Sequence, residues 1–529
     1  MVRPVACGEF GAQPEQPGWV DRATPAGARC TGPTSGGAMQ TVPLRSVKTD
    51  PVAESYERLR RAQAASPYPS LAEREDWLAR LERVLVDNAE RFVAAIDADF
   101  GGRSRHETLL ADIYATLEGV RDARKHVADW MQARPAQPSP YFLPSKALVE
   151  PIPRGVVGII APWNYPVNLA LAPLAGALAA GNRALLKPSE LTPRTSELLG
   201  HALRERFTAE EIAVVEGGPD VATAVTKLPL DHLLFTGSTN VGKKVASAAA
   251  ENLVPTTLEL GGKSPALVHS DYALPKAARR IALGKLFNAG QTCIAPDYAL
   301  VPEGRENEFA NAFRDAALAA YPELPRGADY TAIVSDNHRA RLVALLDDAR
   351  AKGARVEVLG GASDGHSRRL APALVFGPTP AMRVMQEEIF GPILPIVTYR
   401  VLDEALAFIA ARPRPLAFYY FDDDAHRAQD VLRRTPSGGA TVNDTLVHFA
   451  QESLPFGGIG ASGNGAYHGQ AGFETFSHLR GVLVASPLAA ARRLQSPPYG
   501  RTLDAALEFL VGGVRRSTPM RMLRALRRR

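Results

Sequence analysis

The chain has 529 residues, 46% of them hydrophobic and 22% charged, which is an ordinary globular composition whose length requires two or three domains. The formal net charge is +5, but seven arginines lie between Arg515 and Arg529 with no acid among them, so the rest of the chain is slightly negative. This balance argues against nucleic acid as the main partner. Neither a run of about 20 apolar residues nor a signal-peptide pattern occurs, so we expect a cytoplasmic protein without a transmembrane helix.

The first 45 residues are rich in Gly, Pro, Ala, Thr and Ser and show no helical or strand periodicity. Such a segment cannot bury enough apolar surface to offset its ordering entropy, so we predict a disordered tail over residues 1–45, with Met39 as an alternative start. Cys7 and Cys30 fall in this tail, which leaves Cys293 as the single cysteine of the folded part. A single thiol cannot form an internal disulfide and fits a reducing compartment.

Long amphipathic helices are expected from about Asp50, in "VAESYERLRRAQAA", "LAEREDWLARLERVLVDNAERFVAAIDADF" and "HETLLADIYATLEGVRDARKHVADWM". From Gly155 short apolar strands alternate with helices, beginning with "GVVGIIAP", "LALAPLAGALAAG" and "RALLKPS". A second alternating region begins near Thr256 and contains the expected helix "ALPKAARRIALGKLFNAG". Alternation of this kind indicates an α/β fold with parallel sheets covered by helices on both faces. The stretch from Pro436 to Gly481 is Gly-rich and irregular, and a Pro-rich link and a basic end follow it.

Three side chains are candidates for the chemistry. Cys293 stands in "FNAGQTCIAPDY", where the turn offers backbone N–H groups to an oxyanion, although a lone cysteine is more often a small buried hydrophobe. Glu259 in "LELGGKSP" is either part of an ordinary strand or helix end, or a general base whose carboxyl pKa is raised by an apolar pocket. Asn164 in "APWNYP" either caps the next helix or donates to an oxygen that gains charge during reaction.

Other segments suggest a dinucleotide site. Lys187 and Glu190 in "KPSE" come at the carboxyl end of an expected parallel strand, where α/β sheets bind ligands. Gly237 and Gly242 in "FTGSTNVGK" open a helix, but their spacing is not that of the G-x-G-x-x-G fingerprint. The sequence has no Cys/His cluster with metal-ligand spacing, no serine nucleophile elbow and no P-loop, so no metal site is expected.

Seven segments, in this order, resemble the aldehyde dehydrogenase superfamily: "PWNYP", "KPSE", "FTGSTNVGK", "LELGGKSP", "FNAGQTCIAPDY", "EEIFGPILPI" and "SLPFGGIGASGNGAYHG". The resemblance covers about residues 46–482. "KPSEL", "GQTCIAPDY" and "GAYHG" are most similar to the class 3 branch, and "NDTLVHFAQESLPFGG" and "PPYGRTLDAALEFL" to its bacterial coniferyl-aldehyde dehydrogenases. Asn464 is a small departure, since relatives in this branch often carry methionine there.

The resemblance implies two Rossmann-like parallel-sheet domains and a bridging element. It places an NAD(P)-binding domain at 46–255, with part of the bridging element near 135–154, a catalytic domain at 256–435, a bridging or oligomerisation segment at 436–484, and a C-terminal extension at 485–529. The branch is typically dimeric, so a homodimer is expected.

The resemblance also implies oxidation of an aldehyde to its acid with NAD, or NADP as an alternative, through a thioester on the cysteine. The implied catalytic residues are the nucleophile Cys293, the oxyanion donor Asn164 and the water-activating Glu259. The implied cofactor-binding residues are Lys187, Glu190, Gly237, Ser238, Gly242, Glu388 and Phe390, and Tyr165 is expected to line the aldehyde pocket. The aldehyde is expected to be aromatic, such as coniferyl aldehyde, or medium- to long-chain aliphatic.

Two alternatives remain at this point. A CoA-acylating aldehyde dehydrogenase would release the thioester to CoA, but such enzymes tend to lack the glutamate that stands here at position 259. A non-catalytic protein on the same fold would have lost the nucleophile or the oxyanion donor, and both Cys293 and Asn164 are present. For the arginine-rich end, we expect at most weak, salt-dependent contact with an anionic lipid surface.

Overall fold

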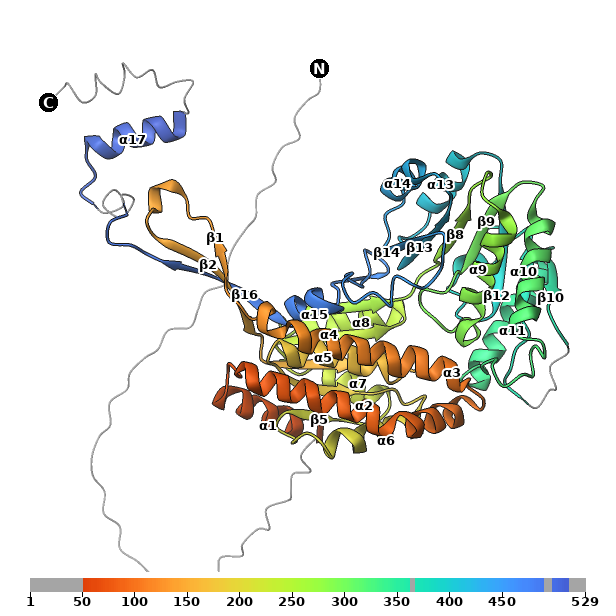
Figure 1. The fold of residues 1–529 in the computed structure, drawn as a ribbon, viewed down its shortest axis with the longest axis horizontal. Coiled ribbons are helices and arrows are strands. Elements are labelled where there is room, and N and C mark those ends of the chain that lie inside the picture. Colours follow the sequence, from red (N-terminus) through yellow and green to blue (C-terminus); the bar gives the residue numbers. More distant parts are fainter. Residues whose placement is uncertain (1–50, 362–366, 490–496, 513–529) are drawn as a thin grey trace, which may run out of the picture. The chain divides into compact units, whose positions relative to one another are not determined.

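The computed structural model describes residues 51–361, 367–489 and 497–512 (Figure 1). The predicted tail 1–45 and the arginine-rich end 515–529 lie outside the described residues. Three long helices open the described part: α1 (Pro51–Ala65), α2 (Leu71–Phe100) and α4 (Ala115–Trp130). The start of α2 is fixed by a capping box, in which Ser70 and Glu73 each accept a backbone N–H from the other. The short α3 (Arg105–Glu107) and the π-helical turn η1 (Thr108–Tyr114) join α2 to α4.

A six-stranded sheet follows, in the order β15-β7-β6-β3-β4-β5. Its parallel strands are β3 (Val156–Ile160), β4 (Arg183–Lys187), β5 (Ile212–Val214), β6 (His232–Gly237) and β7 (Thr256–Leu260). Helices α5 (Asn168–Ala179), α6 (Pro193–Arg204), α7 (Pro219–Thr226) and α8 (Thr239–Ala250) connect them. Every residue of β3 and β4 is buried, which explains why these strands read as continuous apolar runs.

The second sheet has seven strands in the order β10-β11-β12-β9-β8-β13-β14. The strands are β8 (Pro265–Val268), β9 (Tyr298–Pro302), β10 (Arg355–Val358), β11 (Ala373–Phe376), β12 (Ile393–Tyr399), β13 (Ala417–Phe421) and β14 (Gly439–Val442). Its helices are α9 (Leu274–Leu286), α10 (Glu306–Ala320), α11 (Asp336–Ala351), α12 (Arg383–Gln386), α13 (Leu402–Ala410) and α14 (Ala425–Arg434). In each large sheet only one edge strand pairs antiparallel, β10 here and β15 in the six-stranded sheet, so both sheets have the predicted α/β character.

A third, antiparallel sheet joins β1 (Arg134–Ala136), β2 (Lys146–Pro153) and β16 (Ser477–Val484). This sheet pairs the region near 135–154 with the end of the segment 436–484. Both were predicted to belong to the bridging element. The remaining elements are η2 (Pro140–Phe142), η3 (Phe287–Gly290), β15 (Gly463–Asn464), α15 (Gly469–Thr475) and α17 (Arg501–Gly512).

Two of the predicted domain boundaries do not coincide with the divisions between these sheets. Strand β7, at 256–260, pairs with β6 in the six-stranded sheet, so the boundary after residue 255 falls one strand too early. The segment 436–484 is divided among all three sheets, because β14, β15 and β16 each pair in a different one. A change of sheet leaves no mark on hydrophobic periodicity, since each strand is apolar whichever neighbour it pairs with. No helix among the described residues is long and apolar enough to cross a membrane.

Candidate active site

The carboxyl ends of four parallel strands bring predicted site residues to one edge of the six-stranded sheet. Lys187 and Gly237 end β4 and β6, and Glu259 is the penultimate residue of β7. Asn164 follows β3, whose residues pair with both β4 and β6. Segments about 95 residues apart in the chain therefore meet where parallel α/β sheets bind their ligands.

The loop that carries Cys293 leaves helix α9 through an unusual backbone. The predicted helix through Gly290 ends at Leu286, and Asn288 and Ala289 have φ of 53° and 49°, a left-handed conformation that is uncommon for residues other than glycine. Surrounding bonds hold this conformation in place. The buried Glu107 carboxylate accepts the Asn288 N–H at 3.1 Å. The chain is thus turned sharply just before the cysteine.

Gln291 fixes the same loop to the body of the second sheet. Its side-chain amide donates to the Ala332 carbonyl at 3.0 Å, and its side-chain oxygen accepts the Val334 N–H at 3.0 Å. The glutamine is fully buried, so these bonds are not exposed to competition from water. Cys293 is therefore held two residues from a rigid anchor.

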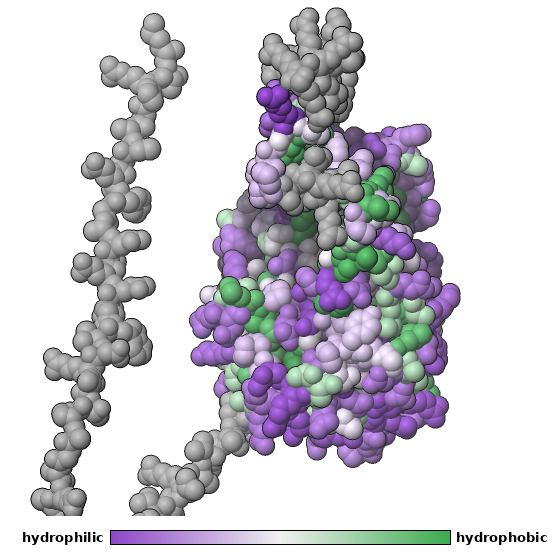
Figure 2. Space-filling view, turned by 90° about the vertical axis from the view of Figure 1, so that its left-hand side faces the viewer, coloured by the Kyte–Doolittle hydropathy of each residue, from purple (hydrophilic) through white to green (hydrophobic). Residues whose placement is uncertain are grey.

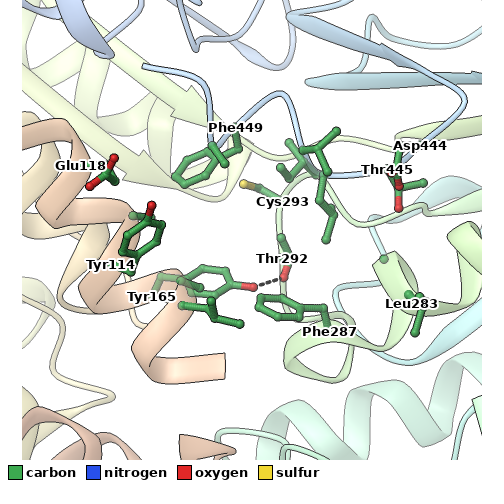
Figure 3. A pocket seen from close by; sticks show the side chains of 18 of the residues that line it. Tyr114, Glu118, Tyr165, Leu283, Phe287, Thr292, Cys293, Asp444, Thr445 and Phe449 are labelled. Carbon is green, nitrogen blue, oxygen red and sulfur yellow. Dashed lines mark hydrogen bonds between the residues drawn. The ribbon is translucent and has the colours of Figure 1, made fainter. Parts of the chain in front are cut away.

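Cys293 lies in the wall of a cavity of about 460 Å³ (Figure 3). The Tyr165 hydroxyl and the Thr292 hydroxyl are 2.6 Å apart beside it, as the dashed line in Figure 3 shows. Burial, together with the Glu388 and Glu259 carboxyls, raises the pKa of the Cys293 thiol to about 12, although its own N–H and that of Ile294 oppose this rise. The thiol must lose a proton to act as a nucleophile, so both the carboxyls and the backbone N–H groups bear on its reactivity.

Asn164 is buried, and its side-chain amide donates to the Gln291 carbonyl at 3.2 Å. An amide nitrogen has two N–H donors, so one remains for an oxygen near the cysteine. Two donors on the backbone oxygen of Asn164 hold the residue itself: Arg103 Nη1 at 2.8 Å and Asn288 Nδ2 at 3.0 Å. Asn164 is therefore tied to the loop of Cys293 through both its main chain and its side chain.

Arg103 was not among the predicted site residues. Its guanidinium is fully buried, lies 4.9 Å from the centre of the Tyr165 ring, and forms an ion pair with the equally buried Asp112 at 3.2 Å. Asp112 in turn accepts the Val167 and Asn168 N–H groups at 3.1 and 3.2 Å, at the start of helix α5. The pair thus joins helix η1 to the backbone around Asn164.

Arg103→Met should lower the free energy of unfolding by about 3–5 kcal/mol, because it leaves the Asp112 carboxylate buried without its cation. Denaturant unfolding measures this loss. Arg60→Met is the control, since Arg60 and Glu57 form an exposed pair whose attraction is screened by water and contributes little to stability. Equal effects of the two substitutions would contradict the role given to Arg103.

Glu259 is 3% exposed, and neither of its carboxyl oxygens has a hydrogen-bond partner among the described residues. Burial raises the pKa of this carboxyl well above its ordinary range. A glutamate with only a structural role at the end of a strand would not have a buried carboxyl without a hydrogen-bond partner, because each such oxygen carries a desolvation penalty. An unpartnered buried carboxyl that affects the cysteine electrostatically is instead what a general base requires.

Glu388 lies against the backbone that follows β7. A Cβ at Gly261 would come within 1.9 Å of its carboxyl oxygen, so a larger residue there would displace the Glu388 carboxyl. Burial and the nearby Asp297 raise the pKa of Glu388 to about 8, against the opposing N–H of Gly262. Phe390, at φ 52°, packs edge-on against Trp163 with ring centres 5.3 Å apart.

The predicted adenosine side of the cofactor site also comes together. Lys187 is buried, and its ammonium donates to the Glu190 carboxylate at 2.5 Å. Ser238 caps helix α8 by accepting the Val241 N–H. Gly242 lets this helix approach β7, because a Cβ there would lie 2.5 Å from Leu260. A charged pair at the end of β4 and a helix N-terminus after β6 suit a dinucleotide with ribose hydroxyls and a pyrophosphate, so the residues fit NAD.

Asn464, the departure from relatives, has a defined role in packing. Its side-chain oxygen accepts the Leu258 N–H at 2.9 Å, one residue from Glu259. The substitution therefore attaches the Gly-rich segment to the strand that carries the carboxyl. Among the described residues, no group of three or more His, Cys, Asp or Glu side chains could hold a metal ion.

Comparison with known proteins defines the class. The model of the aldehyde dehydrogenase family matches residues 19–482. A probable coniferyl aldehyde dehydrogenase of Pseudomonas aeruginosa is 49% identical over 85% of this chain and 94% of its own length. A coniferyl aldehyde dehydrogenase of a Pseudomonas species is 44% identical over 88% of this chain and 97% of its own length.

Solved structures agree with the sequence comparison. The aldehyde dehydrogenase AldH of Staphylococcus aureus, in a substrate-bound state, has a TM-score of 0.80 at 40% identity and covers 83% of this chain and 95% of its own. An indole-3-acetaldehyde dehydrogenase of P. syringae, in complex with NAD+, has a TM-score of 0.76 at 27% identity, covering 82% and 89%. The chain belongs to the aldehyde dehydrogenase family. Its reaction is the oxidation of a small aldehyde with NAD or NADP as the oxidant.

Proposed function

We propose that the protein oxidises an aromatic aldehyde of the coniferyl type to its carboxylic acid, with Cys293 as the nucleophile and water as the final acceptor of the acyl group. The observation that carries the chemistry is the pairing of a cysteine in the wall of a large cavity with the buried, unpartnered carboxyl of Glu259. The relatives named above supply the substrate class.

The residues divide the reaction among them. The Cys293 sulfur attacks the aldehyde carbon, and the tetrahedral oxyanion accepts hydrogen bonds from the Asn164 side chain and the Cys293 backbone N–H. NAD, when bound, would supply the acceptor for the hydride that leaves this carbon. Glu259 then takes a proton from a water molecule, which attacks the thioester and releases the acid. Lys187 and Glu388 would hold the two riboses of the cofactor.

Water is preferred to CoA as the acyl acceptor because Glu259 serves only a hydrolytic step. A CoA-acylating enzyme does not hydrolyse the thioester, so it needs no base to deprotonate water. This chain keeps the Glu259 carboxyl buried, although its burial costs desolvation free energy. Addition of CoA should therefore leave the rate of NADH formation unchanged.

The cavity walls favour a flat, apolar substrate. Tyr114 and Phe449 lie on one side of Cys293, and Phe287 lies below it, beside Tyr165 (Figure 3). A planar ring can stack or meet edge-on with such side chains. Leucines, alanines, Ile294 and Val447 complete the apolar part of the lining, and four charged residues also border the cavity: Glu118, Arg280, Asp444 and Glu452.

Phe449→Ala should lower kcat/KM for coniferyl aldehyde about tenfold or more, because burying a phenyl group contributes roughly 1.5–3 kcal/mol. Acetaldehyde, which is too small to reach this side chain, should lose less than about threefold. Both values come from initial rates of NADH formation. A wild-type protein that prefers octanal to coniferyl aldehyde, or a variant that loses both substrates equally, would contradict the aromatic assignment.

The preference for NAD is a second proposal, and Glu190 carries it. Its partly exposed carboxylate can accept ribose hydroxyls but repels a 2′-phosphate. Glu190→Gln should therefore raise the kcat/KM ratio of NADP to NAD by about tenfold. Glu205→Gln, an exposed carboxylate just after helix α6, is the control. A wild-type protein with the higher kcat/KM for NADP would overturn the proposal.

We further propose that the protein is a homodimer assembled through β16. This strand is at one end of its sheet, so its outer edge is unpaired among the described strands, and Leu479, Leu483 and Val484 are exposed on it. Figure 2, which faces this side of the molecule, shows hydrophobic side chains between polar ones. An open edge of this kind favours pairing with another chain, and sedimentation equilibrium tests it. The free thiol of Cys293 fits the cytoplasm.

A further inference from the structure

The Tyr467 hydroxyl is buried next to the catalytic carboxyl. Tyr467 is 3% exposed, and its hydroxyl has no hydrogen-bond partner among the described residues. The segment before it is paired with β7: Gly463 is opposite Glu259, and the Leu260 N–H donates to the Ser462 carbonyl at 3.0 Å. Tyr467 therefore comes four residues after the partner of the proposed base.

Three groups act electrostatically on this hydroxyl. Burial raises the pKa of Tyr467 well above its ordinary range, and Glu259, Cys293 and Glu452 raise it further. The hydroxyl is therefore neutral, can both donate and accept a hydrogen bond, and lies within reach of the field of two carboxyl groups.

Glu452 lies on the outer side of Tyr467. The two side chains line a small cavity of about 10 Å³ together with His468 and Gly469, which is room for about one water molecule. Glu452 also lines the substrate cavity, so its carboxyl borders both spaces. Burial raises the pKa of Glu452 to about 7, Asp122 and Glu118 add to this rise, and the Gly469 N–H opposes it.

The reaction makes a proton route necessary. Aldehyde, NAD+ and water give a carboxylate, NADH and two protons, and one of these protons is taken up by Glu259 when water attacks the thioester. Glu259 is buried and is not among the residues that line the substrate cavity. Its proton must leave before the next turnover. His468 cannot carry it as a cation, because burial lowers the pKa of this imidazole to about 3.

We propose that Tyr467 and Glu452 form the route by which this proton leaves. Neither the Glu259 carboxyl nor the Tyr467 hydroxyl has a direct hydrogen-bond partner among the described residues, so a water molecule must bridge each transfer. The protonated Glu259 gives its proton through water to the Tyr467 oxygen, while the hydroxyl gives its own proton, through water in the small cavity, to the Glu452 carboxylate. Glu259 is restored as a carboxylate, and Glu452 releases the proton to water in the substrate cavity. One O–H bond breaks and one forms at each oxygen, and no electrons are transferred. The proposal rests on Glu259 as the base, and Tyr467 is a positioning and relay residue.

Tyr467→Phe and Glu452→Gln are the direct tests. In rapid mixing with saturating NAD and coniferyl aldehyde, the first turnover of NADH should stay within about twofold of wild type, because hydride transfer precedes the use of the route. In the turnovers after the first, acid formation in quenched samples, and proton release followed with a pH indicator in weak buffer, should each be slowed about tenfold. The double variant should be no slower than the slower single variant, since both changes interrupt one path.

Two controls separate a relay from a loss of structure. Glu452→Asp keeps a titratable carboxyl and should recover acid formation to within about threefold of wild type. Tyr272→Phe also removes a buried, unpartnered hydroxyl, but at the start of α9, far along the helix from Cys293, and it should change nothing.

Acid formation at the wild-type rate in both Tyr467→Phe and Glu452→Gln would overturn the route, as would an equal loss of the NADH burst. Glu259→Gln distinguishes a failure of the base assignment from a failure of the proton route. If that variant deacylates normally, the base assignment fails. If it stalls while the Tyr467 and Glu452 variants do not, only the route fails.

Discussion

Cys293→Ala should lower NADH formation by a factor of about 10⁴ or more, because alanine removes the thiol that forms the covalent bond to the aldehyde. The thiol is the only free one among the described residues, and it lies in the cavity wall beside the Tyr165 and Thr292 hydroxyls. The neighbouring backbone is fixed by Gln291 and not by the sulfur, so the loop should keep its shape. Steady-state rates with coniferyl aldehyde measure the loss.

Binding of NAD to this variant is the matched control. The cofactor-binding groups lie on β4, α8 and the loop of Glu388, and none of them contacts the sulfur through a hydrogen bond. The dissociation constant for NAD should therefore stay within about threefold of wild type. Turnover above a trace would rule out Cys293 as the nucleophile.

Glu259→Gln should lower steady-state turnover by about 10²–10⁴-fold, since the amide cannot take a proton from water. Attack by the thiol and hydride transfer do not use this carboxyl, so a burst of NADH about equal to the number of active sites should remain. Stopped-flow absorbance measures both phases. Glutamine has nearly the shape of glutamate, and the carboxyl has no hydrogen-bond partner to lose, so the fold should be unaffected. Normal steady-state turnover in the variant would refute the base.

Much of the site could be predicted because its residues follow strand ends. The α/β alternation predicts parallel sheets, and the carboxyl ends of parallel strands meet at one edge. The convergence of Lys187, Gly237 and Glu259 could therefore be expected from the sequence alone. The family and its reaction, which the seven segments suggested, are confirmed by the comparisons. The individual roles of the site residues stay predictions.

Residues that act through buried contacts could not be predicted. Arg103 and Asp112 are an ordinary basic and acidic residue in the sequence, and only the packing of η1 against the loop after β3 shows that they are a buried ion pair. Glu107 likewise becomes significant only through the turn at Asn288. The burial of Tyr467 depends on the pairing of β15 with β7, a contact between positions about 200 residues apart. Local periodicity carries no information about such long-range contacts.

The covalent thioester is the central claim, and the intact mass of Glu259→Gln tests it most directly. The variant is mixed with excess coniferyl aldehyde and NAD, quenched in acid during the burst, and its mass is measured before and after proteolysis. The account predicts an acyl group on most molecules, located on the peptide that contains Cys293, and removable by hydroxylamine. An unmodified cysteine at the end of a full NADH burst would contradict the account.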